Sequence, residues 1–308
     1  MLENKNIAVL IPCFNEEQTI SSVVSGFRES LPRAHIVVCD NNSNDSTKKI
    51  ALELGVTVLS QPLQGKGYAV EHMFRVIDAD FYVLVDGDST YDPEVAETAV
   101  EKCITESLDM LVGVRMSADG HKTYLPLRSF GNTLFTKALR VLFSSKLNDV
   151  LSGYRVFSRR FVKSMPILSG GFGIETEMNI HALSLSFAIG EFETQYFERP
   201  LGSVSKLGTF KDGTVILITI FRMLFEHRPL VILSVAAVVL GLAGGLLFFP
   251  IIQTYFETGL VPRLPTAIFS LSLMLMSLFS FFSGLILDGI SRQRVEGKKL
   301  VLLSVGDR

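Results

Sequence analysis

Residues 81–88 read Phe-Tyr-Val-Leu-Val-Asp-Gly-Asp, an apolar run that leads directly into two aspartates separated by one glycine. A short run of β-branched and aromatic residues predicts a buried strand, so Asp86 and Asp88 stand where that strand ends. Carboxylate oxygens are the ligands that Mg²⁺ and Mn²⁺ prefer. Two clustered anions also repel each other unless a cation lies between them. The pattern predicts a divalent-metal site, although the spacing alone fits a turn rich in Asp and Gly equally well.

Short strands alternate with helical stretches through roughly the first 200 residues. The predicted strands cover residues 7–11, 35–39, 56–59, 81–85 and 108–112. Such alternation is typical of an α/β fold in which helices flank a mostly parallel sheet. In sheets of this kind, ligands bind beyond the carboxyl ends of the strands. We therefore expect a binding site at that edge.

Polar loops follow the first two predicted strands. Residues 12–17 contain no glycine fingerprint for a dinucleotide, which disfavours a Rossmann dehydrogenase. Residues 40–47 form a polar loop that could bind a nucleoside through Asp40. The same residue types also fit a turn followed by a helix cap at Asp45 or Ser46.

Residues 64–67, Gln-Gly-Lys-Gly, open the next helical stretch. Backbone N–H groups at a helix start, together with the charge of Lys66, suit a bound diphosphate. Two glycines and a lysine also make an ordinary loop.

Composition excludes some classes of protein. The net charge is −2 and the 29 basic residues are spread along the chain, so we expect no nucleic-acid partner. The three cysteines are widely spaced and odd in number, which favours free thiols in a reducing compartment.

Two long apolar segments lie near the C-terminus. Residues 230–249 and 265–287 carry no charge, and each is long enough to cross a hydrocarbon core of about 30 Å. They predict a transmembrane hairpin, with the buried core helices of a soluble protein as the alternative. The connecting loop holds one cation, Arg263, whereas several cations flank the outer ends of the hairpin. The positive-inside rule therefore predicts an integral membrane protein whose catalytic domain and termini are both cytoplasmic.

The predicted organisation has four parts. Residues 1–210 form the catalytic domain, 211–228 a juxtamembrane helix, 229–290 the membrane hairpin and 291–308 a cytoplasmic tail. The juxtamembrane stretch suits a helix lying at the membrane surface, or else an ordinary packed helix.

Five motifs occur in order along the chain, at residues 11–17, 40–47, 65–67, 86–88 and 149–155. Together they resemble those of the GT-A glycosyltransferases of the dolichol-phosphate mannose synthase and bactoprenol glucosyltransferase type. The resemblance implies a GT-A fold and an inverting transferase that depends on Mg²⁺ or Mn²⁺. It also implies that a hexose moves from a nucleotide-sugar to a polyprenyl phosphate, with UDP-glucose, UDP-GlcNAc or GDP-mannose as donor.

The resemblance also assigns roles to individual residues. Asp86 and Asp88 correspond to the metal motif, with Asp88 also counted as catalytic, and Thr90 stands where some members carry a metal-contacting Gln. Asp149 corresponds to the acid on the acceptor side and is counted as catalytic together with Asp88. The positions implied for the nucleotide-sugar are Pro12, Asn15, Glu16, Asp40, Asn42, Lys66 and Asp86.

Basic residues between the metal motif and the apolar segments predict an acceptor phosphate. The resemblance singles out Arg115, Arg128, Arg155 and Lys206, with scattered solvated cations on surface helices as the alternative. The planar guanidinium of arginine can donate two hydrogen bonds to phosphate at once. A phosphate monoester has a second pKa near 6, so it attacks as a dianion without a strong base. Asp149 is therefore expected to orient the acceptor or to balance charge, although its place in the sequence would also suit a general base.

Several alternatives remain open from the sequence. Glu177 and His121 are weaker site candidates, explained as well by a helix first turn and by a solvated loop. A processive polysaccharide synthase is disfavoured because its Gln-x-x-Arg-Trp segment is missing and the chain has no tryptophan. A different acceptor, such as a glycolipid or a polysaccharide, and a noncatalytic nucleotide-binding membrane protein also remain. The oligomeric state is open, a homo-oligomer included.

Overall fold

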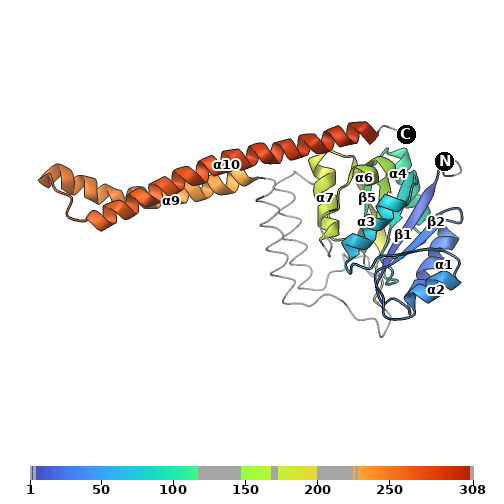
Figure 1. Ribbon diagram of the computed structural model, residues 1–308. Helices are drawn as coiled ribbons and strands as arrows, with labels where there is room; N and C mark the ends of the chain where they lie inside the picture. The colour runs from blue at the N-terminus through green and yellow to red at the C-terminus, as the bar shows by residue number, and fades with distance from the viewer. Residues whose placement is uncertain are drawn as a thin grey trace. The chain divides into compact units, whose positions relative to one another are not determined.

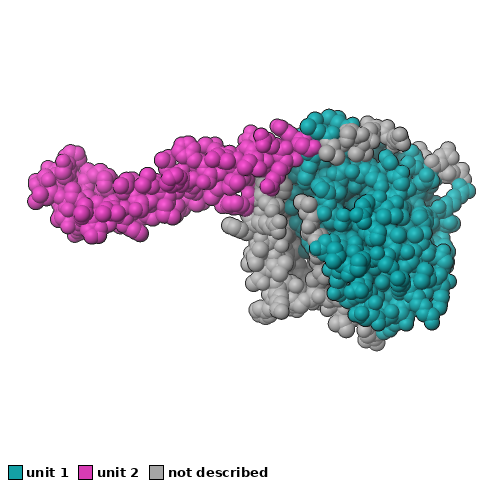
Figure 2. Space-filling model, in the orientation of Figure 1, with its two compact units in different colours: residues 1–216, 298–308 teal, residues 217–297 magenta. Residues whose placement is uncertain are grey.

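The computed structural model describes residues 2, 5–116, 147–167, 173–199, 225 and 228–305. The predictions for Arg128, Lys206, His121 and residues 211–224 lie outside this part of the chain. Two compact units are present, residues 1–216 with 298–308, and residues 217–297, shown in teal and magenta in Figure 2.

A seven-stranded sheet organises the described part of the first unit (Figure 1). The strands are β1 (Ile7–Cys13), β2 (His35–Asp40), β3 (Thr57–Ser60), β4 (Phe81–Leu84), β5 (Met110–Met116), β6 (Arg155–Ser158) and β7 (Ile189–Gln195). Their order is β3-β2-β1-β4-β6-β5-β7. Every neighbouring pair is parallel except the two that involve β6, which runs antiparallel to β4 and β5. The predicted α/β fold with a mostly parallel sheet is confirmed, and so are its five strands.

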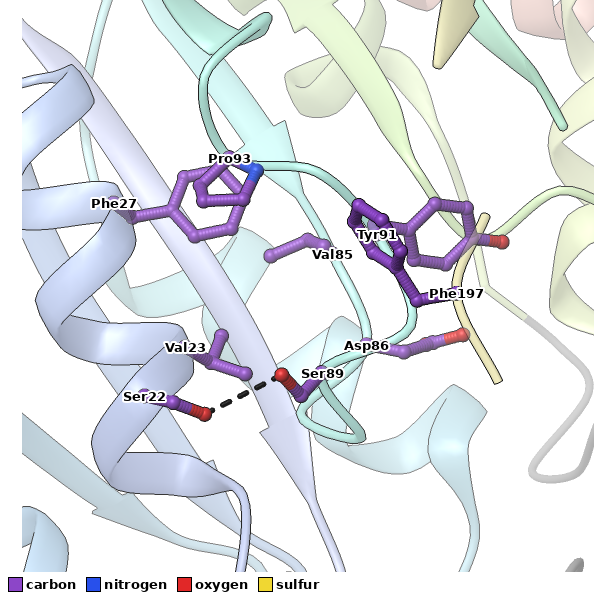
Figure 3. A pocket seen from close by; sticks show the side chains of 9 residues that line it. All are labelled: Ser22, Val23, Phe27, Val85, Asp86, Ser89, Tyr91, Pro93 and Phe197. Atoms are coloured by element: carbon purple, nitrogen blue, oxygen red, sulfur yellow. Dashed lines mark hydrogen bonds between the residues drawn. The ribbon is translucent and has the colours of Figure 1, made fainter. Parts of the chain in front are cut away.

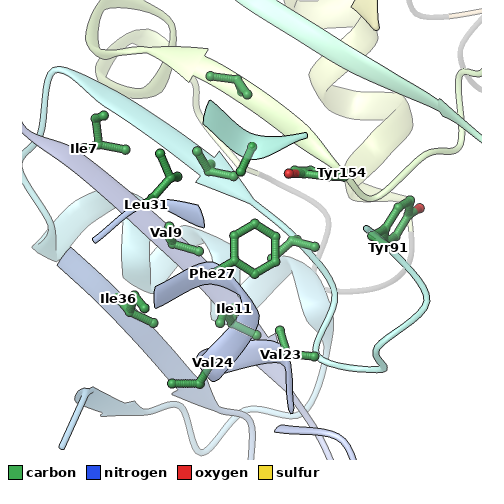
Figure 4. Close-up of a cluster of buried hydrophobic side chains, with 14 of the residues drawn as sticks. Ile7, Val9, Ile11, Val23, Val24, Phe27, Leu31, Ile36, Tyr91 and Tyr154 are labelled. Carbon is green, nitrogen blue, oxygen red and sulfur yellow. The ribbon is translucent and has the colours of Figure 1, made fainter. Parts of the chain in front are cut away.

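Helices connect and cover the strands. They are α1 (Ile20–Ser30), α2 (Thr47–Glu53), α3 (Lys66–Val76), α4 (Ala96–Thr105), α6 (Arg159–Ser164) and α7 (Ile174–Ser184). Alternate residues of a strand point to opposite faces, so Val9 and Ile11 of β1 meet Val24 and Phe27 of α1 on one face (Figure 4). Phe27 is 1% exposed, and truncating such a side chain to alanine costs about 3–5 kcal/mol. This core fixes the carboxyl ends of β1, β2 and β4 beside one another.

The second unit contains the long apolar helix α9 (Pro229–Thr258) and most of a second one, α10 (Leu264–Val305), whose last residues from 298 onward are counted with the first unit. Gly259 ends α9 in the left-handed conformation, with φ 68°. The two helices pack together, because Ser277 Oγ donates to Ala237 O at 2.7 Å and Ser280 Oγ donates to Leu233 O at 2.9 Å.

Both helices are long and apolar enough to cross a membrane. Only 11% of the most apolar window of each is buried, whereas the core helix of a soluble protein is mostly buried. The prediction of two C-terminal apolar helices is confirmed, and each helix is longer than its predicted span.

Candidate active site

The turn that carries the paired aspartates follows β4 at the carboxyl edge of the parallel strands. Gly87 faces β1 so closely that an added Cβ would lie 2.6 Å from Cys13 Sγ. A larger residue at position 87 would therefore have to push the Cys13 side chain aside. The backbone between Asp86 and Asp88 is therefore held against the neighbouring strand.

Asp88 is buried, and both of its carboxylate oxygens accept hydrogen bonds. Oδ1 accepts from the Thr90 hydroxyl at 2.6 Å and from the Thr90 backbone N–H at 3.3 Å. Oδ2 accepts from Arg199 Nη2 at 2.5 Å. The hydroxyl of Thr90 thus supports Asp88 within the same turn.

Asp86 is joined to the start of α3. Lys66 Nζ lies 2.5 Å from Asp86 Oδ1 and also 2.5 Å from Glu175 Oε1 on α7. Burial alone would lower the pKa of Lys66, but the two carboxylates raise it well above its ordinary value. Lys66 is therefore cationic at neutral pH. Counted over Asp86, Asp88, Glu175, Lys66 and Arg199 alone, three carboxylates and two side-chain cations leave one negative charge in excess.

The 149–155 motif lies directly against Asp86. An added Cβ at Gly153 would overlap the Asp86 carboxylate, and the Gly153 N–H donates to Tyr91 Oη at 2.8 Å. Two motifs far apart in the sequence therefore share one site.

Asp149 is fully buried and forms a two-pronged ion pair with Arg115. Arg115 Nε lies 2.7 Å from Oδ2, and Arg115 Nη2 lies 2.9 Å from Oδ1. The guanidinium also stacks over the Tyr196 ring, 5.4 Å from its centroid. Since both oxygens of Asp149 accept from Arg115, the carboxylate serves to orient this cation.

Arg155 lies elsewhere. Its side chain has no exposed surface, and it donates to the carbonyl oxygens of Ser152 and Val150, each at 2.9 Å, and to Asn179 Oδ1 at 2.8 Å. The structure therefore places Arg155 beneath the 149–155 loop, where it holds the loop backbone and does not face a phosphate.

The loops at the ends of β1 and β2 hold most of the positions implied for the nucleotide-sugar. Asp40 is 5% exposed, and its Oδ1 has no hydrogen-bond partner among the described residues. A buried unpaired oxygen is costly, so this atom suits an N–H donor of a ligand. Pro12 lies near the end of β1 and is partly buried, and Asn42 is exposed with φ 63°.

Asn15 and Glu16 tie these two loops together. The Asn15 N–H donates to Ser43 Oγ at 3.0 Å, and the Glu16 N–H donates to Thr47 Oγ1 at 2.8 Å. Asn15 itself has φ 53°, a left-handed conformation that asparagine tolerates well. These contacts give both residues a role in shaping the loops.

Three contributors were not singled out from the sequence. Arg199 and Glu175 hold Asp88 and Lys66, as described above. Asn41 Nδ2 donates to Leu63 O at 2.6 Å, and Asn41 Oδ1 accepts from the Gly65 N–H at 2.6 Å, which fixes the loop before α3. No local pattern predicts these contacts, because each joins separate parts of the sequence.

A cavity of about 110 Å³ lies behind the acidic turn, between α1 and residues 85–93 (Figure 3). Asp86 and Ser89 line it, and Ser89 Oγ lies 3.3 Å from Ser22 Oγ. Ligand pockets commonly measure about 300–1,000 Å³, so this cavity is too small for a nucleotide-sugar.

The acidic turn offers part of a metal site. Among the described residues, no group of three or more His, Cys, Asp or Glu side chains is arranged to hold an ion. Mg²⁺ is commonly held by one or two carboxylates, with phosphate oxygens and water as the remaining ligands. Asp86 and Asp88 fit that partial donor set, provided that a ligand supplies phosphate.

An α/β fold with an acidic turn at the carboxyl edge of its parallel strands defines a class of proteins that bind ligands there. Residues 8–165 match the model of the family described as Glycosyl transferase family 2. The chain belongs to this family, which confirms the resemblance found from the motifs.

Relatives and solved structures agree with this assignment. The chain is 32% identical to glycosyltransferase AglJ of Haloferax volcanii over 225 residues, covering 73% of this chain and 74% of AglJ. It is 29% identical to the dolichyl-phosphate hexose transferase of the same organism over 223 residues, covering 72% and 96% of the two chains. A glucosyl-3-phosphoglycerate synthase from Mycobacterium tuberculosis, solved with Mn²⁺ and UDP-glucose, is 22% identical with a TM-score of 0.55. That match covers 72% of this chain and 79% of the synthase, and it shows a common fold.

Proposed function

We propose that this glycosyltransferase moves a hexose from a nucleotide-sugar to a membrane polyprenyl phosphate, with inversion and with a divalent metal. The main support for the proposal is the set of contacts around the acidic turn. The acidic turn at the sheet edge, in which Asp88 is buried and Asp86 partly exposed, is paired with Lys66 and Arg199 and lies against the 149–155 loop. Anion-binding and cation-binding groups thus converge where a metal-bound diphosphate would be held.

The donor side is supported by Asp40 and Lys66. The unpaired Oδ1 of Asp40 would accept an N–H of the base. Lys66 at the start of α3 offers a cation and a helix N-terminus to the diphosphate. Asp86 and Asp88 would hold Mg²⁺ or Mn²⁺, which compensates the charge that develops on the departing nucleotide.

The acceptor side is supported by Arg115. Its guanidinium is oriented by Asp149 and 17% of the side chain is exposed, so a phosphate could reach this cation. A lipid phosphate dianion would attack the anomeric carbon opposite the departing nucleotide, and this single displacement inverts the configuration. Arg128 and Lys206 remain proposed phosphate contacts by resemblance.

A polyprenyl acceptor agrees with two further features. The name of the dolichyl-phosphate hexose transferase relative states such an acceptor for that protein. The helices α9 and α10 are apolar along lengths that suit a bilayer, where polyprenyl phosphates reside. We propose that they anchor the chain as a hairpin, with residues 1–210 as a cytoplasmic catalytic domain and the tail 291–308 also cytoplasmic.

The test is transfer by the purified full-length chain. Radiolabelled UDP-glucose, UDP-GlcNAc and GDP-mannose are each offered with polyprenyl phosphate and Mg²⁺ or Mn²⁺, followed by lipid extraction. We expect label in the lipid phase from one donor, its loss with EDTA, and a loss of at least about 100-fold in Asp88→Ala.

The same assay separates the other readings. Label on a glycolipid or a polymer, with none on polyprenyl phosphate, would identify a different acceptor. Nucleotide binding without any transfer would identify a noncatalytic protein, and full activity in Asp88→Ala would overturn the metal assignment.

A further inference from the structure

Arg199 reaches Asp88 from 111 residues further along the chain. It donates to Oδ2, while Thr90 donates to Oδ1 from within the same turn. The Asp88 side chain is only 5% exposed. Both oxygens of this carboxylate therefore accept hydrogen bonds, and a metal ion that binds Oδ2 would share that oxygen with the guanidinium of Arg199.

Arg199 is the donor that can leave. Thr90 is two residues from Asp88, and its hydroxyl and backbone N–H both contact the same oxygen. Arg199 reaches Asp88 from a distant part of the chain through a long side chain that is 30% exposed. A guanidinium and a divalent cation on one carboxylate would also repel each other. Metal binding at Asp88 is thus expected to displace the guanidinium.

We propose that Arg199 competes with the divalent metal for Asp88. The displaced guanidinium then binds the diphosphate of the nucleotide-sugar. This inference rests on the proposed function. The cluster of Asp86, Asp88, Glu175, Lys66 and Arg199 carries one excess negative charge, and a bound divalent ion makes it positive by one. That reversal favours an anionic diphosphate, and the planar guanidinium suits phosphate oxygens.

Metal and nucleotide binding are therefore coupled through Arg199. The nucleotide raises the metal affinity by the factor by which the metal raises the nucleotide affinity, because such coupling is reciprocal. Removing the charge of Arg199 frees Asp88 for the metal and removes one partner of the diphosphate. In Arg199→Gln, metal affinity without nucleotide should rise, and the enhancement that nucleotide provides should fall.

The experiment measures Mn²⁺ binding rather than turnover. Purified full-length protein in detergent is titrated with Mn²⁺, and free Mn²⁺ is followed by electron paramagnetic resonance, alone and with saturating UDP or GDP. We expect Arg199→Gln to bind Mn²⁺ about tenfold more tightly than the wild type without nucleotide, the size of one charge-assisted hydrogen bond. The enhancement by nucleotide should drop by a similar factor.

The matched control is Arg159→Gln. Arg159 pairs with Asp78 at 3.0 Å, and that pair takes no part in the acidic turn. This variant should bind Mn²⁺ like the wild type. If Arg199→Gln does not fold by thermal melting, Arg199→Lys takes its place, because an ammonium lacks the guanidinium fork and should show the same change to a smaller extent.

The outcomes separate this inference from the proposed function. If the wild type binds Mn²⁺ and neither Arg199 variant binds it more tightly, the competition is overturned and the proposed metal site remains. A wild type that binds no Mn²⁺ with either nucleotide would overturn both the competition and the proposed metal.

Discussion

At the scale of single residues, the site depends on close backbone approach as much as on charge. Gly153 lies so near Asp86 that a methyl group there would overlap the carboxylate. The glycine of the 149–155 motif therefore sets the position of a residue proposed to bind the metal. Its role is steric.

We predict that Gly153→Ala lowers transfer by about 100-fold while the protein still folds, because a shift of about 1 Å in a positioned group can have that effect. The measurement is initial rate at saturating donor and acceptor, with thermal melting as the check on folding. Gly245→Ala is the control, since an added Cβ there meets no atom within 4 Å. Normal activity in Gly153→Ala would show that Asp86 does not need its observed position.

A second prediction concerns Asp149. In Asp149→Asn the side chain loses the negative charge that orients Arg115, so the KM for lipid phosphate should rise by about tenfold. The pH profile of kcat/KM should keep its shape, because a residue that only orients does not transfer a proton. Loss of the acidic limb of the profile would instead identify Asp149 as a general base.

The sequence predicted the acidic turn but not its partners. Asp86 and Asp88 are visible because they follow an apolar strand directly. The contacts of Arg199 with Asp88 and of Lys66 with Glu175 join residues 111 and 109 positions apart. Such contacts depend on how β7 and α7 return to the sheet, which residue types and spacing do not encode.

At the scale of elements, buried parallel strands were easier to predict than the later ones. β1 and β2 are nearly continuous apolar runs because helices cover both of their faces. β7 carries Glu191 and Glu193 and is mostly only partly buried, so its pattern resembles a loop. β6 is four residues long and begins at Arg155, the last residue of the 149–155 motif, where the sequence predicts a phosphate contact and not a strand.

The packing of α7 predicts how stability depends on pH. His181 is 2% exposed, and burial lowers its pKa to about 3. Its Nε2 lies 3.1 Å from Ser164 Oγ, and its ring packs against Phe161 and Phe187. Below about pH 6.5 His181 takes up a proton in the unfolded chain. In the folded chain it stays neutral until the pH approaches about 3. Stability should therefore fall as pH decreases from about 6.5 toward 3.

We predict that His181→Phe reduces this acid sensitivity. Because the buried imidazole stays uncharged, it lowers the free energy of unfolding by about 2 kcal/mol at pH 5 relative to pH 7.5. Phenylalanine does not titrate, so this loss should be absent in the variant. Thermal melting of both proteins at pH 7.5 and pH 5.0, followed by tyrosine fluorescence, measures the difference. Equal changes in Tm for the two proteins would show that His181 does not contribute.

At the scale of the whole molecule, the proposed function requires a membrane hairpin with a defined orientation. α10 has 42 residues and so measures about 63 Å, roughly twice the thickness of a hydrocarbon core. Charged residues begin at Asp288, where Arg292 pairs with it at 2.8 Å. The apolar half of α10 is therefore expected to lie in the bilayer, and the charged half outside it.

We predict that the loop between α9 and α10 faces away from the cytoplasm, because most cations lie beyond the other ends of the helices. Val261 in that loop is 40% exposed, and a Cβ added at Gly297 on α10 meets no atom within 4 Å. The native cysteines are all buried, so they should react little in the folded protein.

In intact cells, a membrane-impermeant maleimide should label Val261→Cys, but it should label Gly297→Cys only after permeabilisation. The reverse pattern would invert the orientation, and labelling of both from outside would mean that the helices do not span the membrane as a hairpin. Either result would separate the catalytic unit from a cytoplasmic pool of nucleotide-sugar, which the proposed reaction needs on the same side of the bilayer as the acidic turn.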